Sequence, residues 1–177
     1  MIIETDRLVL RPPRAEDARA VFERYASDPR VTRYLGWPTH RTLDDTRGFL
    51  KFCAAEWHRW PAGPFLIESR ETQTLLGSTG LGFDSPQQAA TGYVLAHDAW
   101  GAGYATESLT AMRDLASRLG VQRLYALCHP DHRASARVLD KCGFTLESTL
   151  RGHSEFPNLV PGVAADVRCY AMRPAIC

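Results

Sequence analysis

The sequence predicts one mixed α/β domain whose central mixed sheet carries helices on both faces. The chain has 177 residues and is 45% hydrophobic, so it can bury a complete core in a single unit. Strand-like alternation and helix-like periodicity follow one another along the chain, which is typical of a sheet covered by helices. No internal repeat, linker or low-complexity tract divides it. We therefore expect one domain over residues 1–177.

The first half of the chain predicts a strand, two helices and a hairpin. Pro12 stops the strand, and Asp28 with Pro29 ends the first helix. Thr42 opens the second helix as part of a capping box with Asp45. The expected elements are a strand at Arg7–Arg11, helices around Ala18–Tyr25 and Thr42–Trp60, and hairpin arms at Phe65–Glu68 and Leu75–Phe83.

The second half predicts alternating strands and helices. Gly120 and Gly143 follow two of the helices at positions where a left-handed residue closes a helix. This alternation indicates a mixed sheet rather than a purely antiparallel one. The expected elements are a strand at Gly92–Ala96, a helix at Tyr104–Leu119, a strand at Arg123–Cys128, a helix at Ser135–Cys142, and strands at Phe144–Leu150 and Asp166–Arg173.

Composition excludes several classes of protein. Lys and Arg total 21 against 20 for Asp and Glu. The chain therefore lacks the surplus of basic residues that is typical of a nucleic-acid-binding protein. Apolar runs are far shorter than a membrane span, and the N-terminus is charged where a signal peptide would be apolar. The five cysteines form no C-x-x-C pair, which disfavours a disulfide framework or a zinc ribbon. We therefore expect a cytoplasmic protein.

The second hairpin arm contains three residues without side chains: Gly77, Gly80 and Gly82. Glycine weakens a strand unless something approaches the backbone closely. This arm therefore faces a ligand, packs tightly against a neighbour or carries a bulge, and the sequence leaves these alternatives open.

A glycine-bearing loop lies between the strand at Gly92–Ala96 and the following helix. From Trp100 to Glu107 it runs Trp-Gly-Ala-Gly-Tyr-Ala-Thr-Glu. Free N–H groups and the helix dipole attract anions to a helix start, and Gly101 and Gly103 let phosphate oxygens approach the backbone. The loop therefore predicts a ligand that contains a phosphate or pyrophosphate.

Two common phosphate-binding loops do not fit this stretch. A P-loop requires Gly-Lys-Ser/Thr, and no Lys lies near. A Rossmann fingerprint requires G-x-G-x-x-G, but Thr106 stands at the last glycine and no acidic residue follows about 20 residues later. An NTPase and a dinucleotide-binding domain are therefore disfavoured.

The loop and its surroundings resemble the GNAT N-acetyltransferase superfamily. The acetyl-CoA-binding motif of that superfamily is Q/R-x-x-G-x-G/A, and here it runs Trp-Gly-Ala-Gly-Tyr-Ala from Trp100. The RimJ/RimL branch, which modifies N-terminal amines of ribosomal proteins, commonly shows Gly-Tyr and then Trp-Gly-x-Gly-Tyr-Ala-Thr-Glu, as Gly92-Tyr93 and the loop do. The segments Thr5–Arg11 and His132–Phe144 are also similar to this branch.

This resemblance implies a fold, a co-substrate and a binding site. The fold is a central twisted mixed sheet of about six to seven strands with helices on both faces. Acetyl-CoA is the donor, with its pantetheine between the splayed strands Gly92–Ala96 and Arg123–Cys128 and its acetyl carbonyl near the N–H of Leu95. The implied contacts to acetyl-CoA are Tyr93, Val94, Leu95, Trp100, Gly101, Ala102, Gly103, Tyr104, Ala105, Thr106, His132 and Ser135.

Protonation of the departing CoA thiolate needs an acid. Many members of the superfamily place a Tyr four residues before the Gly of Gly-Phe, but Leu139 stands there in this chain. Ser135 matches the serine that the RimJ/RimL resemblance implies as a substitute. The same Ser135 can equally cap the following helix, and both roles remain open.

His132 departs from the family, which has Asn at this place to bind the pantetheine arm. Histidine has a different reach and titrates near neutrality, so we expect acetyl-CoA binding to be weaker or to depend on pH, and we count His132 among the catalytic candidates. Cys128 and His129 lie close in sequence to His132. A catalytic zinc needs three well-placed ligands and acetyl transfer has no task for one, so we expect no metal.

The base that deprotonates the amine is not fixed by the sequence. Glu107 matches the branch motif and is our catalytic candidate, although it can instead stabilise the start of its helix. Trp37 either contacts the acceptor or anchors its loop, whereas Trp57 and Trp60 fit the buried face of their helix. Further candidates for the base are Asp84, His97, Asp98, His153, Glu155 and Asp166.

We therefore expect an acetyl-CoA-dependent N-acetyltransferase that acts by direct attack of the amine in a ternary complex. Its acceptor is a primary amine, either a protein N-terminal α-amine or a small molecule. The alternative is a catalytically weak CoA-binding module that serves as a sensor or an interaction partner. We expect no nucleic-acid or membrane partner, and the resemblance makes a homodimer a further expectation.

Overall fold

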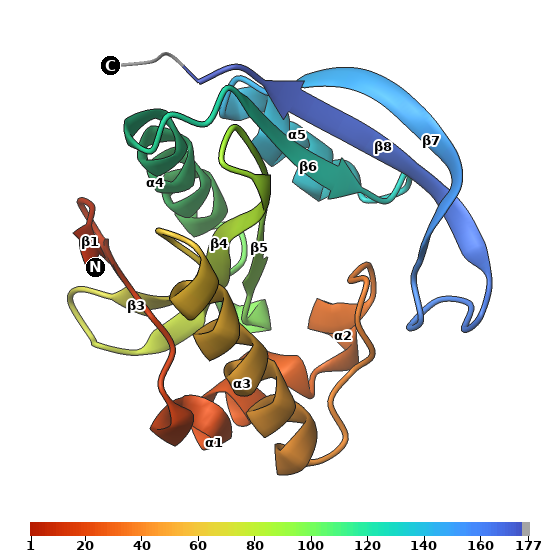
Figure 1. Cartoon of the computed structure of the whole chain (residues 1–177). Coiled ribbons are helices and arrows are strands. Elements are labelled where there is room, and N and C mark those ends of the chain that lie inside the picture. Colours follow the sequence, from red (N-terminus) through yellow and green to blue (C-terminus); the bar gives the residue numbers. More distant parts are fainter. Residues whose placement is uncertain (175–177) are drawn as a thin grey trace.

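A computed structural model describes residues 1–174 and shows one eight-stranded sheet with helices on both faces (Figure 1). The strand order is β1-β2-β3-β4-β5-β6-β8-β7, and β5 with β6 is the parallel pair in an otherwise antiparallel sheet. The mixed class is therefore confirmed. The strands are β1 (Ile3–Glu4), β2 (Leu8–Arg11), β3 (Pro64–Ser69), β4 (Leu75–Ser85), β5 (Gln88–Leu95), β6 (Arg123–Cys128), β7 (Thr145–Glu155) and β8 (Ala164–Met172).

The expectation of six to seven strands is one short. The additional strand, β1, has two residues, Ile3 and Glu4, which pair with β2. So short an element shows no period in the sequence, and only its partner strand makes it a strand. The expected strand Gly92–Ala96 is also longer than predicted, because Gln88 to Leu95 pair with β4 around a tight turn.

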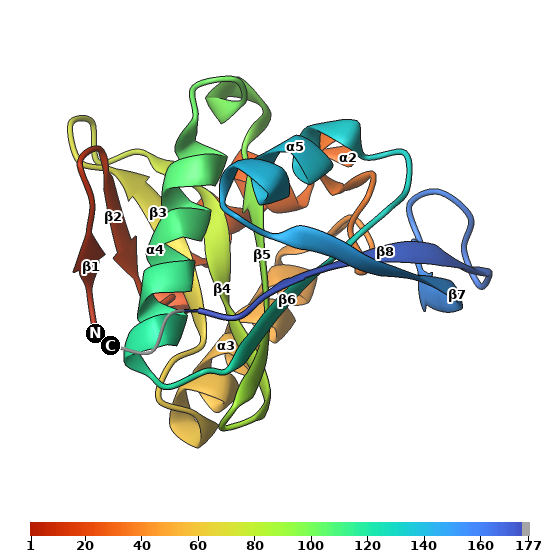
Figure 2. The same cartoon turned by 90° about the horizontal axis from the view of Figure 1, so that it is seen from above.

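The helices pack on opposite faces of the sheet (Figure 2). On one face, α1 contacts β4 and α3 contacts β3. On the other face, α4 contacts β2, β4 and β5, and α5 contacts α4 and β6. The helices are α1 (Ala18–Val21), α2 (Pro29–Thr32), α3 (Leu43–Arg59), α4 (Tyr104–Arg118) and α5 (Arg133–Lys141).

The first predicted helix is observed, and a second short helix that the sequence did not predict follows it. A 3-10 turn, α1 and a π-helical turn at Phe22–Ala26 run together, and α2 then begins at Pro29. The side chain of Asp28 accepts a hydrogen bond from the amide of Arg30, which makes Asp28 the N-cap of α2. Asp-Pro therefore ends one helix and starts the next, because Pro suits the first helical position.

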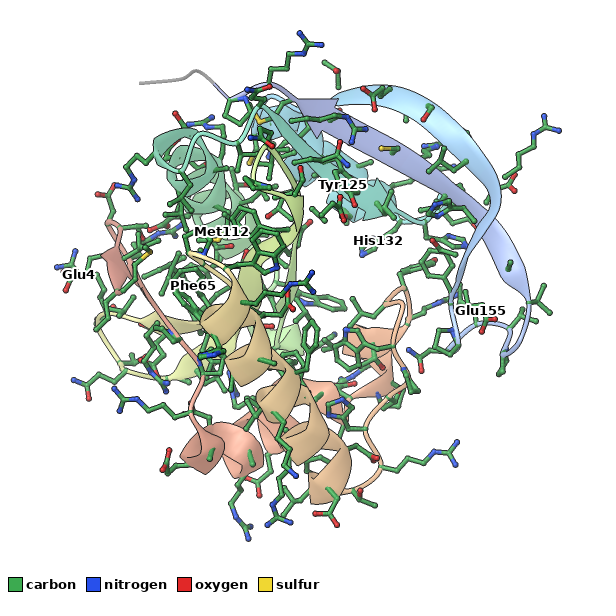
Figure 3. The ribbon with its side chains drawn as sticks, viewed as in Figure 1. Glu4, Phe65, Met112, Tyr125, His132 and Glu155 are labelled. Atoms are coloured by element: carbon green, nitrogen blue, oxygen red, sulfur yellow. The ribbon has the colours of Figure 1, made fainter. Side chains whose placement is uncertain are left out.

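Two apolar layers fill the space between the sheet and the helices. Figure 3 shows Phe65 of β3 and Met112 of α4, both fully buried. The ring of Trp57 on α3 meets Phe65 edge-on at 4.9 Å, and its Nε1 donates to the carbonyl of Pro64 at 2.6 Å. The prediction that Trp57 belongs to the packed face of its helix is therefore confirmed, and Trp60 stacks on Phe83 likewise.

Tight packing explains two of the three strand glycines. A Cβ on Gly77 would lie 2.0 Å from the carbonyl oxygen of Val94, and one on Gly80 would lie 2.7 Å from Cα of Pro64. Neither distance is compatible with a side chain, so the packing alternative holds for both. A Cβ on Gly82 would meet nothing within 4 Å.

The sheet opens between β5 and β6. These parallel strands pair only over residues 88–90 and 123–125, so their C-terminal halves diverge. The predicted splay of these two strands is therefore confirmed. Within residues 1–174, no helix combines the length and apolar character that a membrane crossing requires.

Candidate active site

A cavity of about 650 Å³ lies where β5 and β6 diverge. Residues from α2, the end of β5, the glycine loop and α5 line it. Its volume falls within the range of small-molecule and cofactor sites. Eleven of the twelve residues expected to hold acetyl-CoA line it: Tyr93, Val94, Leu95, Trp100, Gly101, Gly103, Tyr104, Ala105, Thr106, His132 and Ser135.

The register of β5 turns two backbone amides toward the opening. Ala96 donates to the carbonyl of Leu76 at 2.8 Å, so that residue points its polar groups at β4. Alternate residues of an antiparallel strand point their N–H groups to opposite sides. The amides of Tyr93 and Leu95 therefore face the gap toward β6, where pairing has ceased. The indole Nε1 of Trp100 donates a hydrogen bond to the carbonyl of Leu95 at 2.9 Å.

The glycine loop has the conformation of an anion site. Gly101 and Gly103 have φ values of +76° and +85°, a region that side-chain-bearing residues rarely adopt. Gly103 is the N-cap of α4, and its carbonyl accepts the amide of Glu107. The amides of Tyr104, Ala105 and Thr106 precede that first helical bond, so they are available to a ligand.

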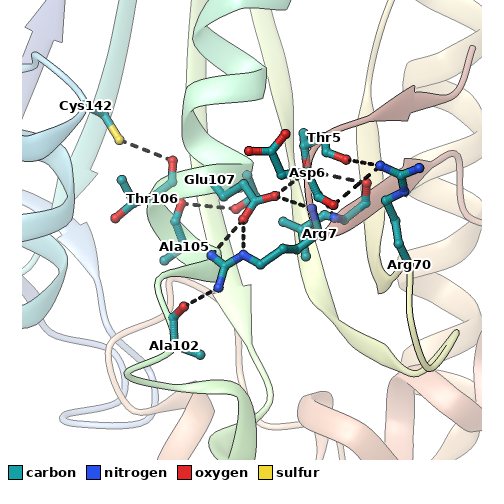
Figure 4. Close-up of polar contacts among 11 residues, drawn as sticks. Thr5, Asp6, Arg7, Arg70, Ala102, Ala105, Thr106, Glu107 and Cys142 are labelled. Carbon is teal, nitrogen blue, oxygen red and sulfur yellow. Dashed lines mark hydrogen bonds and ion pairs between the residues drawn. The ribbon is translucent and has the colours of Figure 1, made fainter.

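Glu107 lies outside this cavity. Figure 4 shows its carboxylate directed at the turn between β1 and β2, where Thr5 Oγ1 donates at 2.6 Å and the amide of Arg7 at 2.8 Å. The Arg7 guanidinium also binds this carboxylate, with its Nε donating to Glu107 Oε2 at 2.7 Å. Burial alone would raise the pKa of Glu107, but these hydrogen bonds outweigh it and hold the pKa below its usual value. The structure does not bring Glu107 together with the other catalytic candidates.

Ser135 and Tyr93 meet across the gap. Tyr93 Oη donates to Ser135 Oγ at 3.3 Å, and both residues line the cavity. Burial raises the pKa of Tyr93 to about 12, so its hydroxyl stays protonated. The alternative role of Ser135 as an N-cap is wrong, because α5 begins earlier, at Arg133, with His132 at the N-cap position.

His132 faces α2 from the N-terminus of α5 (Figure 3). Its ring stacks on Tyr34 at 4.7 Å, and Tyr34 also contacts the ring of His129 at 5.0 Å. Burial and the neighbouring His129 lower the pKa of His132, so its imidazole is neutral at pH 7. A neutral imidazole can accept a proton from a group that enters the cavity.

Most of the other candidates for the base lie elsewhere. Asp84 accepts from Tyr125 Oη at 2.9 Å, and Asp98 is held by the fork of Arg24 at 2.9 and 3.0 Å. Of the remaining candidates, His97 lines the cavity, whereas His153, Glu155 and Asp166 do not. No Asp or Glu occurs among the described residues that line it. His97 and His132 are the imidazoles among the described residues that line it.

The sequence analysis missed Tyr34, which lines the cavity, and Asn158, which does not line it but holds the segment after α2. Asn158 Oδ1 accepts from the amide of Thr39 at 2.8 Å, and its Nδ2 donates to the carbonyls of Thr32 and Trp37 at 2.7 and 2.9 Å. The β7–β8 loop is thereby joined to the segment after α2. Asn158 is the only Asn of the chain, which is the one signal that could have drawn attention to it.

Three further expectations concern side chains near the site. Leu139 is 2% exposed and belongs to the core, so it takes no part in proton transfer. Trp37 packs on His40 at 5.0 Å and does not line the cavity, which favours its role as a loop anchor. Among residues 1–174, no group of three or more His, Cys, Asp or Glu side chains is placed to hold a metal.

The comparison with known families fits this geometry. Residues 7–145 match the family model described as "Acetyltransferase (GNAT) domain". The chain therefore belongs to the GNAT acetyltransferase family, and its relatives make it an N-acetyltransferase.

Three similar proteins illustrate the relationship. An N-acetyltransferase of Bacillus subtilis, YoaA, whose function is not characterised, is 33% identical over 85% of this chain and 86% of its own. The structure of RimL, a ribosomal L7/L12 α-N-protein acetyltransferase in complex with coenzyme A, has a TM-score of 0.87 at 23% identity, with both chains fully covered. An acetyltransferase of Salmonella typhimurium that modifies the N-terminal serine of L7/L12 has a TM-score of 0.85 at 24% identity, covering 98% of this chain and 99% of the other.

Proposed function

We propose that this protein transfers the acetyl group of acetyl-CoA to a primary amine that attacks the thioester directly. The observation that carries the proposal is the single cavity in which the splayed strands, the glycine loop and the Tyr93–Ser135 pair meet. The fit to acetyl-CoA rests on two features. The open gap beside β5 suits an extended pantetheine arm, and the amides at the start of α4 suit a pyrophosphate.

The chemistry divides into three tasks. The N–H of Leu95 or Tyr93 stabilises the oxyanion that forms when the amine attacks the acetyl carbon. The neutral imidazole of His132 takes the proton that the ammonium of the acceptor must lose. The Ser135 hydroxyl, polarised by the hydrogen bond from Tyr93, donates a hydrogen bond to the negative charge that develops on the CoA sulfur as the C–S bond breaks, and the thiolate then takes its proton from solvent.

The acceptor is proposed to be a protein N-terminal α-amine or a small primary amine. Support for a protein acceptor comes from the fold shared with two enzymes described as acting on L7/L12. The formal net charge of +1 adds no general attraction toward either class.

The experiment that tests the proposal has two stages. Thermal unfolding is measured with acetyl-CoA, with NAD and with ATP, and acetyl-CoA at a hundredfold its Kd is expected to add about 2.7 kcal/mol of stability. Release of free CoA thiol is then followed with peptides that carry a free N-terminal serine or alanine and with a panel of small amines. Binding without any turnover would favour the sensor alternative, and no binding of acetyl-CoA would refute the proposal.

A further inference from the structure

Arg7 and Glu107 form a polar cluster on the outer side of the glycine loop, away from the cavity (Figure 4). The Arg7 guanidinium makes hydrogen bonds in two directions. Its Nε and Nη2 bind Glu107 Oε2 at 2.7 Å, and its Nη1 donates to the carbonyl of Ala102 at 2.9 Å. Arg7 therefore joins the β1–β2 turn both to the first turn of α4 and to the loop that precedes it.

The bond to Ala102 fixes the direction of the next amide. No peptide bond in the described residues is cis, so the C=O and N–H of the Ala102–Gly103 peptide point in opposite directions. Since the carbonyl of Ala102 points out at Arg7, the amide of Gly103 points inward. Gly103 lines the cavity, whereas Ala102 does not. Arg7 thereby orients the first of the amides that face an anion.

The bond to Glu107 balances a charge. Glu107 lies in the first turn of α4, close to the amides that are available for a pyrophosphate, and its side chain is only 16% exposed. An uncompensated carboxylate there would repel an anionic ligand. The Arg7 guanidinium neutralises it and also lies 4.7 Å above the ring of Tyr104, the first residue of the helix.

We propose that Arg7 and Glu107 are positioning residues for the pyrophosphate of acetyl-CoA, holding the glycine loop in its anion-binding shape from behind. The inference rests on the proposed function, because it needs acetyl-CoA as the ligand. It gives the opening segment Thr5–Arg11 a task at the cofactor site, and it makes Glu107 a structural partner of Arg7 instead of the base.

The test measures the Kd for acetyl-CoA and the ligand-free Tm of four variants. Arg7→Met should raise the Kd roughly tenfold or more, because it removes charge-assisted hydrogen bonds from the loop and leaves Glu107 uncompensated. Arg7→Met combined with Glu107→Gln should bind acetyl-CoA more tightly than Arg7→Met alone, since the second change removes the unbalanced charge. A merely structural role would not produce this recovery.

Arg70→Met is the matched control. Arg70 Nη1 donates to the carbonyl of Thr5 at 2.7 Å, so it contacts the same turn without touching Glu107 or the loop. Its loss should leave the Kd unchanged. Glu107→Gln alone should leave kcat within about twofold and change KM for acetyl-CoA, whereas a general base would lose roughly a hundredfold in kcat.

Three results would overturn the inference: an unchanged Kd in Arg7→Met, an equal rise of the Kd in Arg70→Met, or a double variant no better than Arg7→Met. Each is measured against the wild-type protein. If the wild-type protein itself bound no acetyl-CoA, the proposed function would fail instead, so the two failures are distinguishable.

Discussion

Tyr93 and Ser135 stand 42 positions apart in the sequence, and their hydroxyl groups lie 3.3 Å from each other where β5 and β6 separate. Tyr93 comes from the half of β5 that pairs with β4 but no longer with β6, and Ser135 from the first turn of α5. Only the divergence of the two strands leaves room for a ligand beside this pair. The pair is therefore available to a thiolate that leaves within the gap.

Removing either hydroxyl should slow turnover without weakening the binding of acetyl-CoA. Ser135→Ala should lower kcat about a hundredfold, and Tyr93→Phe should lower it less, because Tyr93 acts through Ser135. The Kd for acetyl-CoA should change by less than about twofold, since neither hydroxyl carries the pyrophosphate. Tyr125→Phe is the control, because Tyr125 Oη binds Asp84 outside the cavity. A normal kcat in Ser135→Ala would remove it from the mechanism.

A bulky side chain at Gly103 should abolish acetyl-CoA binding. In Gly103→Val the new Cβ would lie 3.4 Å from Nη2 of Arg7, so the side chain presses on the contacts that hold the loop, and at φ +85° the change also costs about 1–2 kcal/mol of folding stability. Gly120→Val separates these effects, because Gly120 has φ +75° and open space around it at the far end of α4. Calorimetric titration with acetyl-CoA should show loss of binding in Gly103→Val alone. Equal binding by both variants would contradict the phosphate-loop assignment.

Turnover should fall as pH decreases through the lowered pKa of His132. Burial and His129 keep that pKa below the ordinary value, so the neutral base persists at pH 7 and is lost only in more acidic solution. His132→Asn should flatten this acidic limb of kcat/KM. His129→Asn should shift the limb to higher pH, since it removes a charge that opposes protonation of His132. If the acidic limb of kcat/KM were the same in the wild-type protein and in both variants, the titrating group would not be His132.

The same residue makes folding stability depend on pH. The folded-state pKa of His132 is lowered below its unfolded value, so the unfolded chain binds the proton more readily. The free energy of unfolding should therefore decrease as pH falls below the unfolded value of about 6.5. His132→Asn should remove this contribution, as judged from urea unfolding at pH 7 and pH 5.

Asn158→Ala should destabilise the wall beside α2. It leaves the amide of Thr39 and the carbonyls of Thr32 and Trp37 without the hydrogen bonds that Asn158 supplies. The expected loss is about 1–3 kcal/mol, or roughly 2–4 °C in Tm for each kcal/mol. Asn158→Asp keeps the acceptor for Thr39 but places a carboxylate oxygen against the carbonyls of Thr32 and Trp37, so it should destabilise the protein at least as much as Asn158→Ala. An unchanged Tm in Asn158→Ala would show that the two loops hold together without it.

The sequence by itself determined the mixed sheet and most of its elements. Strand and helix periods are local, so the strand at Arg123–Cys128 was predicted with its observed bounds. The glycine loop could also be predicted locally. Glycine directly before a helix start indicates a left-handed residue and exposed amides that can bind an anion. Eleven of the twelve residues that the family resemblance implies for acetyl-CoA line one cavity.

Only the tertiary structure decided which side chains face the cavity and which support it from outside. Glu107 lies in the first turn of α4, beside the amides that face the cavity, yet its carboxylate is bound by Arg7, a hundred residues earlier in the chain. Asn158 likewise contacts Thr39 across 119 positions. Such pairings depend on how distant segments pack, which no local period or motif records. The sequence therefore determines most of the elements and the glycine loop, whereas packing determines which side chains from distant segments contact that loop.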